Sequence, residues 1–306
     1  MTIATRTLGR TGAEVTILGY GAMELRGAPR GPQVTSEHAG QVLNAVLDGG
    51  ITLIDTSPDY GFSEELIGQH VGHRRDEFFL ASKCGCPVEL PTDAPPPYQH
   101  DYRPANVRAA VEQSLARLRT DRLDLVQVHM SPANAVLAEN DVVETLFDLQ
   151  REGKTRFIGM SGILPHLAGH IDLGVFDVFQ VPYSALQREH EDLITRAAEE
   201  GAGILIRGGA ARGAPAEEKN WTINPIGVAD GEGQRRWEQA SLDQLAADAG
   251  MTRMEFTLRF TLSLPALSST IVGTSSLDHL TSNLAAAARG PLPADVYAEA
   301  AKRLAA

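Results

Sequence analysis

The architecture of this chain follows from one segment, which reads Ile51-Thr52-Leu53-Ile54-Asp55-Thr56-Ser57-Pro58-Asp59-Tyr60-Gly61-Phe62-Ser63-Glu64-Glu65. It opens with a short run of apolar and β-branched residues after two glycines, a pattern typical of a buried strand. A proline and a glycine then interrupt regular structure, and Ser63 followed by two acids is typical of a helix start. The segment therefore predicts a strand, a loop and a helix, with Asp55 at the end of the strand and Tyr60 in the loop.

Two more apolar stretches end on ionisable residues in the same manner. Residues 76–83 end on Lys83, and residues 123–129 end on His129. The carboxyl ends of parallel strands meet at one edge of a sheet, where α/β folds place their functional residues. Asp55 alone is equally compatible with a surface turn that it caps. Three such residues on three successive strands predict one shared site.

Strand-like and helix-like segments alternate over the rest of the chain. The expected strands are 17–20, 51–54, 78–82, 123–128, 155–159, 176–180, 202–206 and 270–272. The expected helices that follow them are 36–47, 63–71, 104–119, 141–152, 165–172, 190–200, 252–263 and 276–287. Eight such units predict an α/β fold of the closed (β/α)8 or TIM-barrel type, for which ~250 residues are typical.

Three segments lie outside these eight units. An N-terminal β-hairpin is expected from residues 5–8 and 14–17, which flank a glycine-bounded turn. Two extra helices are expected at 235–249 and 293–304. No linker or low-complexity stretch interrupts the pattern, so residues 1–306 are expected to form a single domain.

Composition and charge exclude several classes of protein. The 306 residues carry a formal net charge of −12, which disfavours nucleic acid and anionic membranes as partners. Residues 1–12 lack the apolar region of a secretory signal, and no apolar run reaches the ~18 residues of a membrane span. We therefore expect a cytoplasmic protein whose partner is a small molecule, and the sequence leaves its oligomeric state open.

Neither the cysteines nor the histidines form a local metal-binding pattern. Cys84 and Cys86 are the only cysteines and lie too close together to bridge easily. His166 and His170 have the i, i+4 spacing of metal ligands on a helix, but no third ligand lies near them in the sequence. We therefore expect no metal site.

The motif Asp55-Thr56-x-x-x-Tyr60-Gly61-x-Ser63-Glu64 resembles the aldo-keto reductase family, and the likeness extends from about Arg6 to Ala288. The resemblance implies that Asp55, Tyr60, Lys83 and His129 are the family's catalytic tetrad. It also implies the extra helices, a nicotinamide cofactor and a carbonyl or alcohol substrate.

The residue types suit that chemistry. Reduction of a carbonyl needs a hydride, which only a cofactor supplies, and a proton for the developing oxyanion. Tyr60 is the expected acid, and the Lys83 ammonium is expected to lower its pKa from ~10. Asp55 is expected to hold Lys83 charged, and His129 to orient the carbonyl through one N–H group.

A second site is expected after the last strand. Residues 270–276 run from this strand into a helix through one glycine and three hydroxyl residues, a pattern that favours phosphate binding. The resemblance implies cofactor contacts at Gly21, Ala22, Met23, Asp55, Ser161, Gln180, Arg207, Gly208, Gly209, Ala210, Gly273, Thr274, Ser275, His279 and Asn283.

Departures from the family pattern bear on cofactor choice. Gly273 and His279 stand where many NADPH-specific members have a lysine and an arginine for the 2′-phosphate. Arg207 stands where many members have an aromatic residue under the nicotinamide, although a guanidinium also stacks. We expect NADP(H) to be favoured by a modest margin, with NAD(H) as the alternative.

Three other functions remain open at this point. One is an NAD-dependent sugar (aldose) dehydrogenase, another is a nicotinamide-binding redox-sensing regulatory subunit, and the third is a cofactor-free barrel lyase. The substrate cannot be read from the sequence because loops build its pocket. The long loops 85–103 and 208–234 are the expected walls of that pocket.

Overall fold

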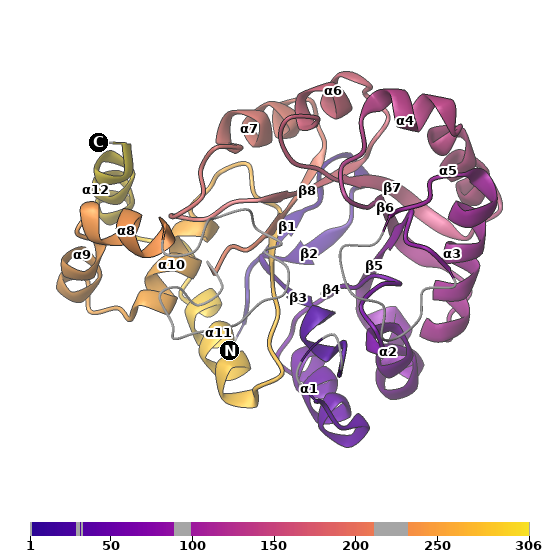
Figure 1. Cartoon of the computed structure of the whole chain (residues 1–306). Helices are drawn as coiled ribbons and strands as arrows, with labels where there is room; N and C mark the ends of the chain where they lie inside the picture. Colours follow the sequence, from indigo (N-terminus) through magenta and orange to yellow (C-terminus); the bar gives the residue numbers. More distant parts are fainter. Residues whose placement is uncertain (1, 29–30, 32, 89–98, 211–231, 306) are drawn as a thin grey trace.

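The centre of the protein is a closed barrel of parallel strands. The computed structural model describes residues 2–28, 31, 33–88, 99–210 and 232–305. The strands follow the order β10-β3-β4-β5-β6-β7-β8-β9, which confirms the expected (β/α)8 fold (Figure 1). They are β3 (Leu18–Gly21), β4 (Leu53–Asp55), β5 (Phe79–Cys84), β6 (Leu123–Val128), β7 (Thr155–Ser161), β8 (Val178–Pro182), β9 (Gly203–Arg207) and β10 (Ser269–Val272). The barrel closes where β10 pairs with β3, with Thr270 opposite Leu18.

Helices surround the barrel because each parallel pair needs a crossover connection. The crossover helices are α1 (Ser36–Asp48), α2 (Ser63–Val71), α3 (Pro104–Leu118), α5 (Val142–Arg151), α6 (Leu167–Asp172), α7 (Glu191–Glu199), α10 (Arg253–Leu262) and α11 (Leu277–Ala288). Several begin as their sequences predict. Thr35 caps α1 by accepting a hydrogen bond from the His38 amide, and Ser276 caps α11 in the same way through the His279 amide.

The extra helices differ from the expectation in one respect. The expected helix 235–249 is two helices, α8 (Glu232–Gln239) and α9 (Leu242–Asp248). The chain bends at Ser241, whose φ of 49° is left-handed and cannot continue a right-handed helix. Helix α12 (Ala294–Ala305) forms as expected and lies beside α8 and α9 at one side of the barrel (Figure 1). The sequence did not predict the short helix α4 (Asn134–Glu139) or the 3-10 helices η2 (Ala22–Leu25) and η3 (Gly72–Glu77).

The two long loops fall largely outside the described residues. The stretches 89–98 and 211–231, which were expected to form much of the pocket wall, lie outside the described residues. Within the described ranges, no helix combines the length and apolar character that a membrane-spanning segment needs.

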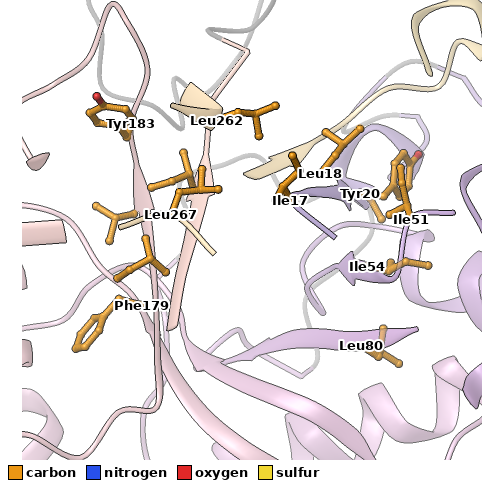
Figure 2. Close-up of a cluster of buried hydrophobic side chains, with 14 of the residues drawn as sticks. Ile17, Leu18, Tyr20, Ile51, Ile54, Leu80, Phe179, Tyr183, Leu262 and Leu267 are labelled. Atoms are coloured by element: carbon orange, nitrogen blue, oxygen red, sulfur yellow. The ribbon is translucent and has the colours of Figure 1, made fainter. Parts of the chain in front are cut away.

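Two layers of apolar side chains fix the barrel. The larger layer lies between strands and helices and includes Tyr20, Ile54 and Leu80 (Figure 2). A smaller layer fills the barrel interior with Leu53, Phe79, Ala81, Leu125, Val178, Leu205 and Ile271. Leu8 and Val15 of the N-terminal hairpin, which is β1 (Thr5–Thr7) paired with β2 (Glu14–Thr16), join this inner layer. The hairpin therefore closes the amino-terminal end of the barrel, and the carboxyl end stays available for a site.

The turn of this hairpin docks against the first residue of β9. Gly9 has a φ of +50°, and a Cβ placed on it would lie 2.2 Å from the Gly203 nitrogen. The Arg10 amide donates a hydrogen bond to the Gly201 carbonyl at 2.7 Å, which holds the turn in place. Glycine is required at this position by both the backbone angle and the close approach.

We predict that Gly9→Ala destabilises the protein more than Gly12→Ala. Both glycines have positive φ, but a Cβ on Gly12 meets nothing within 4 Å. Gly12→Ala should lower the free energy of unfolding by about 1–2 kcal/mol from backbone strain alone, and Gly9→Ala by about 3 kcal/mol because the turn must leave β9. Urea unfolding of both variants measures the difference. Equal losses would mean that the docking of the turn contributes nothing.

Candidate active site

A buried ion pair lies at the carboxyl end of the barrel. The Lys83 ammonium donates hydrogen bonds to Asp55 Oδ1 and to the Thr56 carbonyl, both at 2.7 Å. Asp55 Oδ2 accepts from the side-chain amides of Gln127 at 2.9 Å and Gln180 at 2.8 Å. Only 1% of the Lys83 side chain and 2% of the Asp55 side chain are exposed. Both oxygens of the carboxylate are therefore engaged, and its position fixes that of the ammonium.

The strand period explains why these polar groups meet. Side chains two positions apart on a strand point to the same face, so the residue two positions after an inner-core residue also points into the barrel. Each of the following pairs combines an inner-core residue with such a polar one: Leu53 and Asp55, Ala81 and Lys83, Leu125 and Gln127, Val178 and Gln180, Leu205 and Arg207. The polar residues form the next layer of the interior, directly above the apolar one.

Tyr60 lies beside this pair, as expected. The Lys83 Nζ atom is 5.1 Å from the centre of the Tyr60 ring. Burial raises the pKa of Tyr60 to about 12, and the Lys83 ammonium opposes this shift without cancelling it. The expected net lowering of the Tyr60 pKa is thus not found, because loss of solvent outweighs the attraction between the ammonium and a phenolate. Burial lowers the pKa of Lys83, but Asp55, Tyr60 and Asp59 together outweigh burial and raise this pKa above its ordinary value.

His129 follows β6 and packs edge-on to Tyr60, with ring centres 6.4 Å apart. Burial lowers the pKa of His129 to about 3, although the nearby Asp59 carboxylate acts in the opposite sense. This shift favours a neutral imidazole at pH 7, which carries one N–H group. Its Nδ1 atom faces Cys86, His100 and Asp59, which the sequence did not indicate as partners because they come from separate loops.

A cavity of about 720 Å³ opens above the ion pair. It is lined by most of the residues that were expected to contact a cofactor: Gly21, Met23, Asp55, Gln180, Arg207, Gly208, Gly209, Ala210, Gly273, Thr274, His279 and Asn283. Tyr60 also lines it, so the buried centre and the start of α11 share one cavity. Three described residues that were expected there, Ala22, Ser161 and Ser275, are not among the lining residues.

The cavity is also lined by Arg289, at the carboxyl end of α11, which was not among the expected contacts. Its Nη1 atom donates to both carboxylate oxygens of Glu255 at 2.8 Å. Glu255 also accepts a hydrogen bond from Arg259 at 3.0 Å. Arg289 lies beyond the last expected contact, Asn283, so no local motif marks it.

Comparison with known proteins identifies the family to which this chain belongs. The sequence model of the Aldo/keto reductase family matches residues 17–304. The chain belongs to the aldo/keto reductase family. L-galactose dehydrogenase of Arabidopsis thaliana is 27% identical over 307 residues, which cover 93% of this chain and 88% of that protein.

Solved structures agree with this assignment. A putative aldo-keto reductase of Pseudomonas aeruginosa superposes with a TM-score of 0.71 at 29% identity and covers 93% of this chain and 94% of its own. An aldo-keto reductase of Bacillus halodurans in its holo form has the same fold, with a TM-score of 0.82 at 24% identity, and covers 99% of this chain and 96% of its own.

Aldo/keto reductases generally use nicotinamide cofactors, and the cavity suits one. Its volume falls within the roughly 300–1,000 Å³ of ligand pockets. Gly273 faces Gly21 so closely that a Cβ on Gly273 would lie 2.7 Å from the Gly21 carbonyl oxygen. A lysine at this position therefore requires backbone movement, which explains one departure from the family pattern. The Thr274 hydroxyl accepts from the Ser276 amide at 3.0 Å, so the turn is held in shape before any ligand arrives.

We predict that Lys83→Met destabilises this aldo/keto reductase by about 3–5 kcal/mol. Removing the ammonium leaves the Asp55 carboxylate buried without a counter-charge. The double variant Asp55→Asn/Lys83→Met removes both charges and should recover much of the loss. Chemical denaturation of the three proteins gives the comparison. A double variant no more stable than Lys83→Met would mean that packing, rather than the charge, is responsible.

Proposed function

We propose that the protein reduces an aldehyde or ketone to an alcohol, or runs the reverse reaction, with a nicotinamide nucleotide in the 720 Å³ cavity. One observation carries this proposal, which is that Tyr60 lines this cavity directly beside the buried Lys83–Asp55 pair. A phenol next to a fixed ammonium is suited to donating a proton to a developing oxyanion.

Each polar residue of the centre has a proposed role. A nicotinamide held in the cavity would supply the hydride. Tyr60, whose pKa of about 12 keeps it protonated, gives its proton to the carbonyl oxygen. Lys83 stabilises the phenolate that is left, and Asp55 holds Lys83 in position. Neutral His129 orients the carbonyl through its N–H group.

Residues at the start of α11 are proposed to hold the phosphates of the nucleotide. Thr274, His279 and Asn283 line the cavity there, at a helix amino end that favours anions. Arg289 adds a positive charge only at the opposite, carboxyl end of α11, where Glu255 neutralises part of it. This supports a modest preference for NADP(H) over NAD(H) rather than a large one.

A second candidate is oxidation of a sugar with NAD. It is favoured by Gly273, whose contact with Gly21 leaves no room for a phosphate-binding lysine, and by the relative named L-galactose dehydrogenase. The same residues serve oxidation with their proton transfers reversed. Initial rates with a carbonyl panel and NADPH, compared with rates on L-galactose and other aldoses with NAD, separate the two candidates.

We predict that Tyr60→Phe keeps the fold and cofactor affinity but lowers kcat about 10²–10⁴-fold, which is the contribution of a general acid. Tyr297→Phe is the matched control, because Tyr297 lies on α12 and packs on Phe260. Stopped-flow absorbance of the nicotinamide measures turnover, and fluorescence titration measures cofactor binding. If Tyr60→Phe retains more than about a tenth of the parent rate, Tyr60 is not the acid.

We predict that His279→Arg increases the preference for NADPH over NADH about tenfold. A charge-assisted bond to the 2′-phosphate is worth about 1.5–3 kcal/mol, and NADH lacks that phosphate. Arg289→Ala should lower the preference by less than about tenfold, since Glu255 already engages that guanidinium. Dissociation constants come from fluorescence titration with each nucleotide. A thousandfold NADPH preference unchanged in both variants would contradict this account of the phosphate site.

A further inference from the structure

Behind His129 lies a cluster of four side chains with metal-ligand chemistry. Asp59, Cys86, His100 and His129 each direct one oxygen, nitrogen or sulfur atom to a common point, and these atoms all lie within 4.8 Å of one another. Asp59 follows β4, Cys86 and His100 follow β5, and His129 follows β6. Three successive loops at the mouth of the barrel therefore contribute to the cluster.

The distances among the two nitrogens and the sulfur are close to the edges of a tetrahedral zinc site. With Zn–N distances of about 2.0–2.1 Å and a Zn–S distance of about 2.3 Å, two nitrogens lie roughly 3.3 Å apart and sulfur and nitrogen roughly 3.6 Å apart. His100 Nε2 and His129 Nδ1 are 3.2 Å apart. Cys86 Sγ is 3.4 Å from His129 Nδ1 and 3.8 Å from His100 Nε2. Asp59 Oδ2 is 3.7 Å from His129 Nδ1.

We propose that Asp59, Cys86, His100 and His129 bind one zinc ion. One thiolate, two imidazoles and one carboxylate are ligands that Zn²⁺ accepts together, whereas Mg²⁺ and Ca²⁺ require oxygen ligands. Four protein ligands fill a tetrahedron, so the site is structural and leaves no position for substrate. The sequence analysis expected no metal because these ligands are dispersed over three loops and no short spacing connects them.

Outer contacts hold the ligands in place, as they do around metal sites. The Ser57 hydroxyl donates to Asp59 Oδ1, so that the other carboxylate oxygen faces the cluster. The Asn106 side-chain amide donates to the carbonyls of Cys86 at 3.0 Å and Asp101 at 2.7 Å. These bonds tie together the two ends of the segment that carries Cys86 and His100.

Tyr102 supports the two histidines. Its ring stacks on His100, with centres 6.1 Å apart and an angle of 25° between planes. Its hydroxyl donates to the His129 carbonyl at 2.7 Å. One side chain that is not itself a ligand therefore contacts the ring of His100 and the backbone of His129.

Metal binding has a consequence for His129 that rests on the proposed function. Coordination through Nδ1 leaves the proton of the neutral ring on Nε2. The zinc ion thus selects the tautomer whose N–H group lies on the side of the ring away from the cluster. Zinc binding itself is measured without any enzyme assay, so a failure of the reductase proposal and a failure of this one are distinguishable.

The test begins with metal content and an optical signature. The full-length protein is loaded with Zn²⁺, dialysed and analysed by mass spectrometry, with about one zinc ion per chain expected. Titration of metal-free protein with Co²⁺ should give the near-ultraviolet charge-transfer band of a thiolate bound to cobalt. Cys86→Ser should lose this band, whereas Cys84→Ala should keep it, because Cys84 is a buried free cysteine two residues away and outside the cluster.

Histidine variants test the rest of the site. His100→Gln should weaken Zn²⁺ binding by more than the roughly 10- to 100-fold that loss of an outer contact causes, and Ser57→Ala by an amount within that range. The exposed His73, changed to Gln, should have no effect. Zn²⁺ at 100 times its Kd should raise the Tm of the parent by about 5 °C but not that of His100→Gln.

Melting in EDTA controls for misfolding, since parent and variants should then have similar Tm values. If the parent retains no more zinc than Cys86→Ser, or if Mg²⁺ displaces the ion, the cluster is a hydrogen-bonded network and the proposal is wrong.

Discussion

The buried charge pair of Lys83 and Asp55 is the constraint on which the rest of this structure depends. An ammonium with 1% of its side chain exposed is tolerated only if its counter-ion is fixed and fully hydrogen-bonded. The two amides that complete the Asp55 shell, Gln127 and Gln180, come from β6 and β8. The three adjacent strands β4, β5 and β6 and the more distant β8 must therefore hold their register for the pair to exist, which couples the electrostatics of the site to the fold.

The sequence predicted the parts of this arrangement that repeat. Asp55, Lys83 and His129 each stand at the end of a predicted strand, and the carboxyl ends of parallel strands meet at one edge, so their convergence was predicted. The barrel follows from the alternation of strands and helices, whereas the place of Tyr60 beside the ion pair was implied by the family resemblance. The break at Ser241 did not follow, because a left-handed serine has no sequence signal as clear as glycine or proline.

Contacts between residues on different loops were not predicted from the sequence. The contact of His129 with Cys86 and His100 joins residues whose spacing has no fixed pattern, and Arg289 reaches the cavity only through the packing of α11. The net pKa of Tyr60 depends on how much solvent is lost, which residue types alone do not show. The sequence thus predicted which residue types meet in the site. It did not predict how burial and nearby charges combine to set the pKa of Tyr60.

The pairing of β10 with β3 delays closure of the barrel until most of the chain has been synthesised. Thr270 of β10 lies opposite Leu18 of β3. The first barrel strand, β3, therefore gains its second neighbouring strand only after almost the whole chain has been synthesised. Until then, β3 presents an open edge of backbone N–H and C=O groups, the kind of edge that recruits other strands. A nascent or truncated chain that ends before β10 is consequently prone to aggregate through this edge.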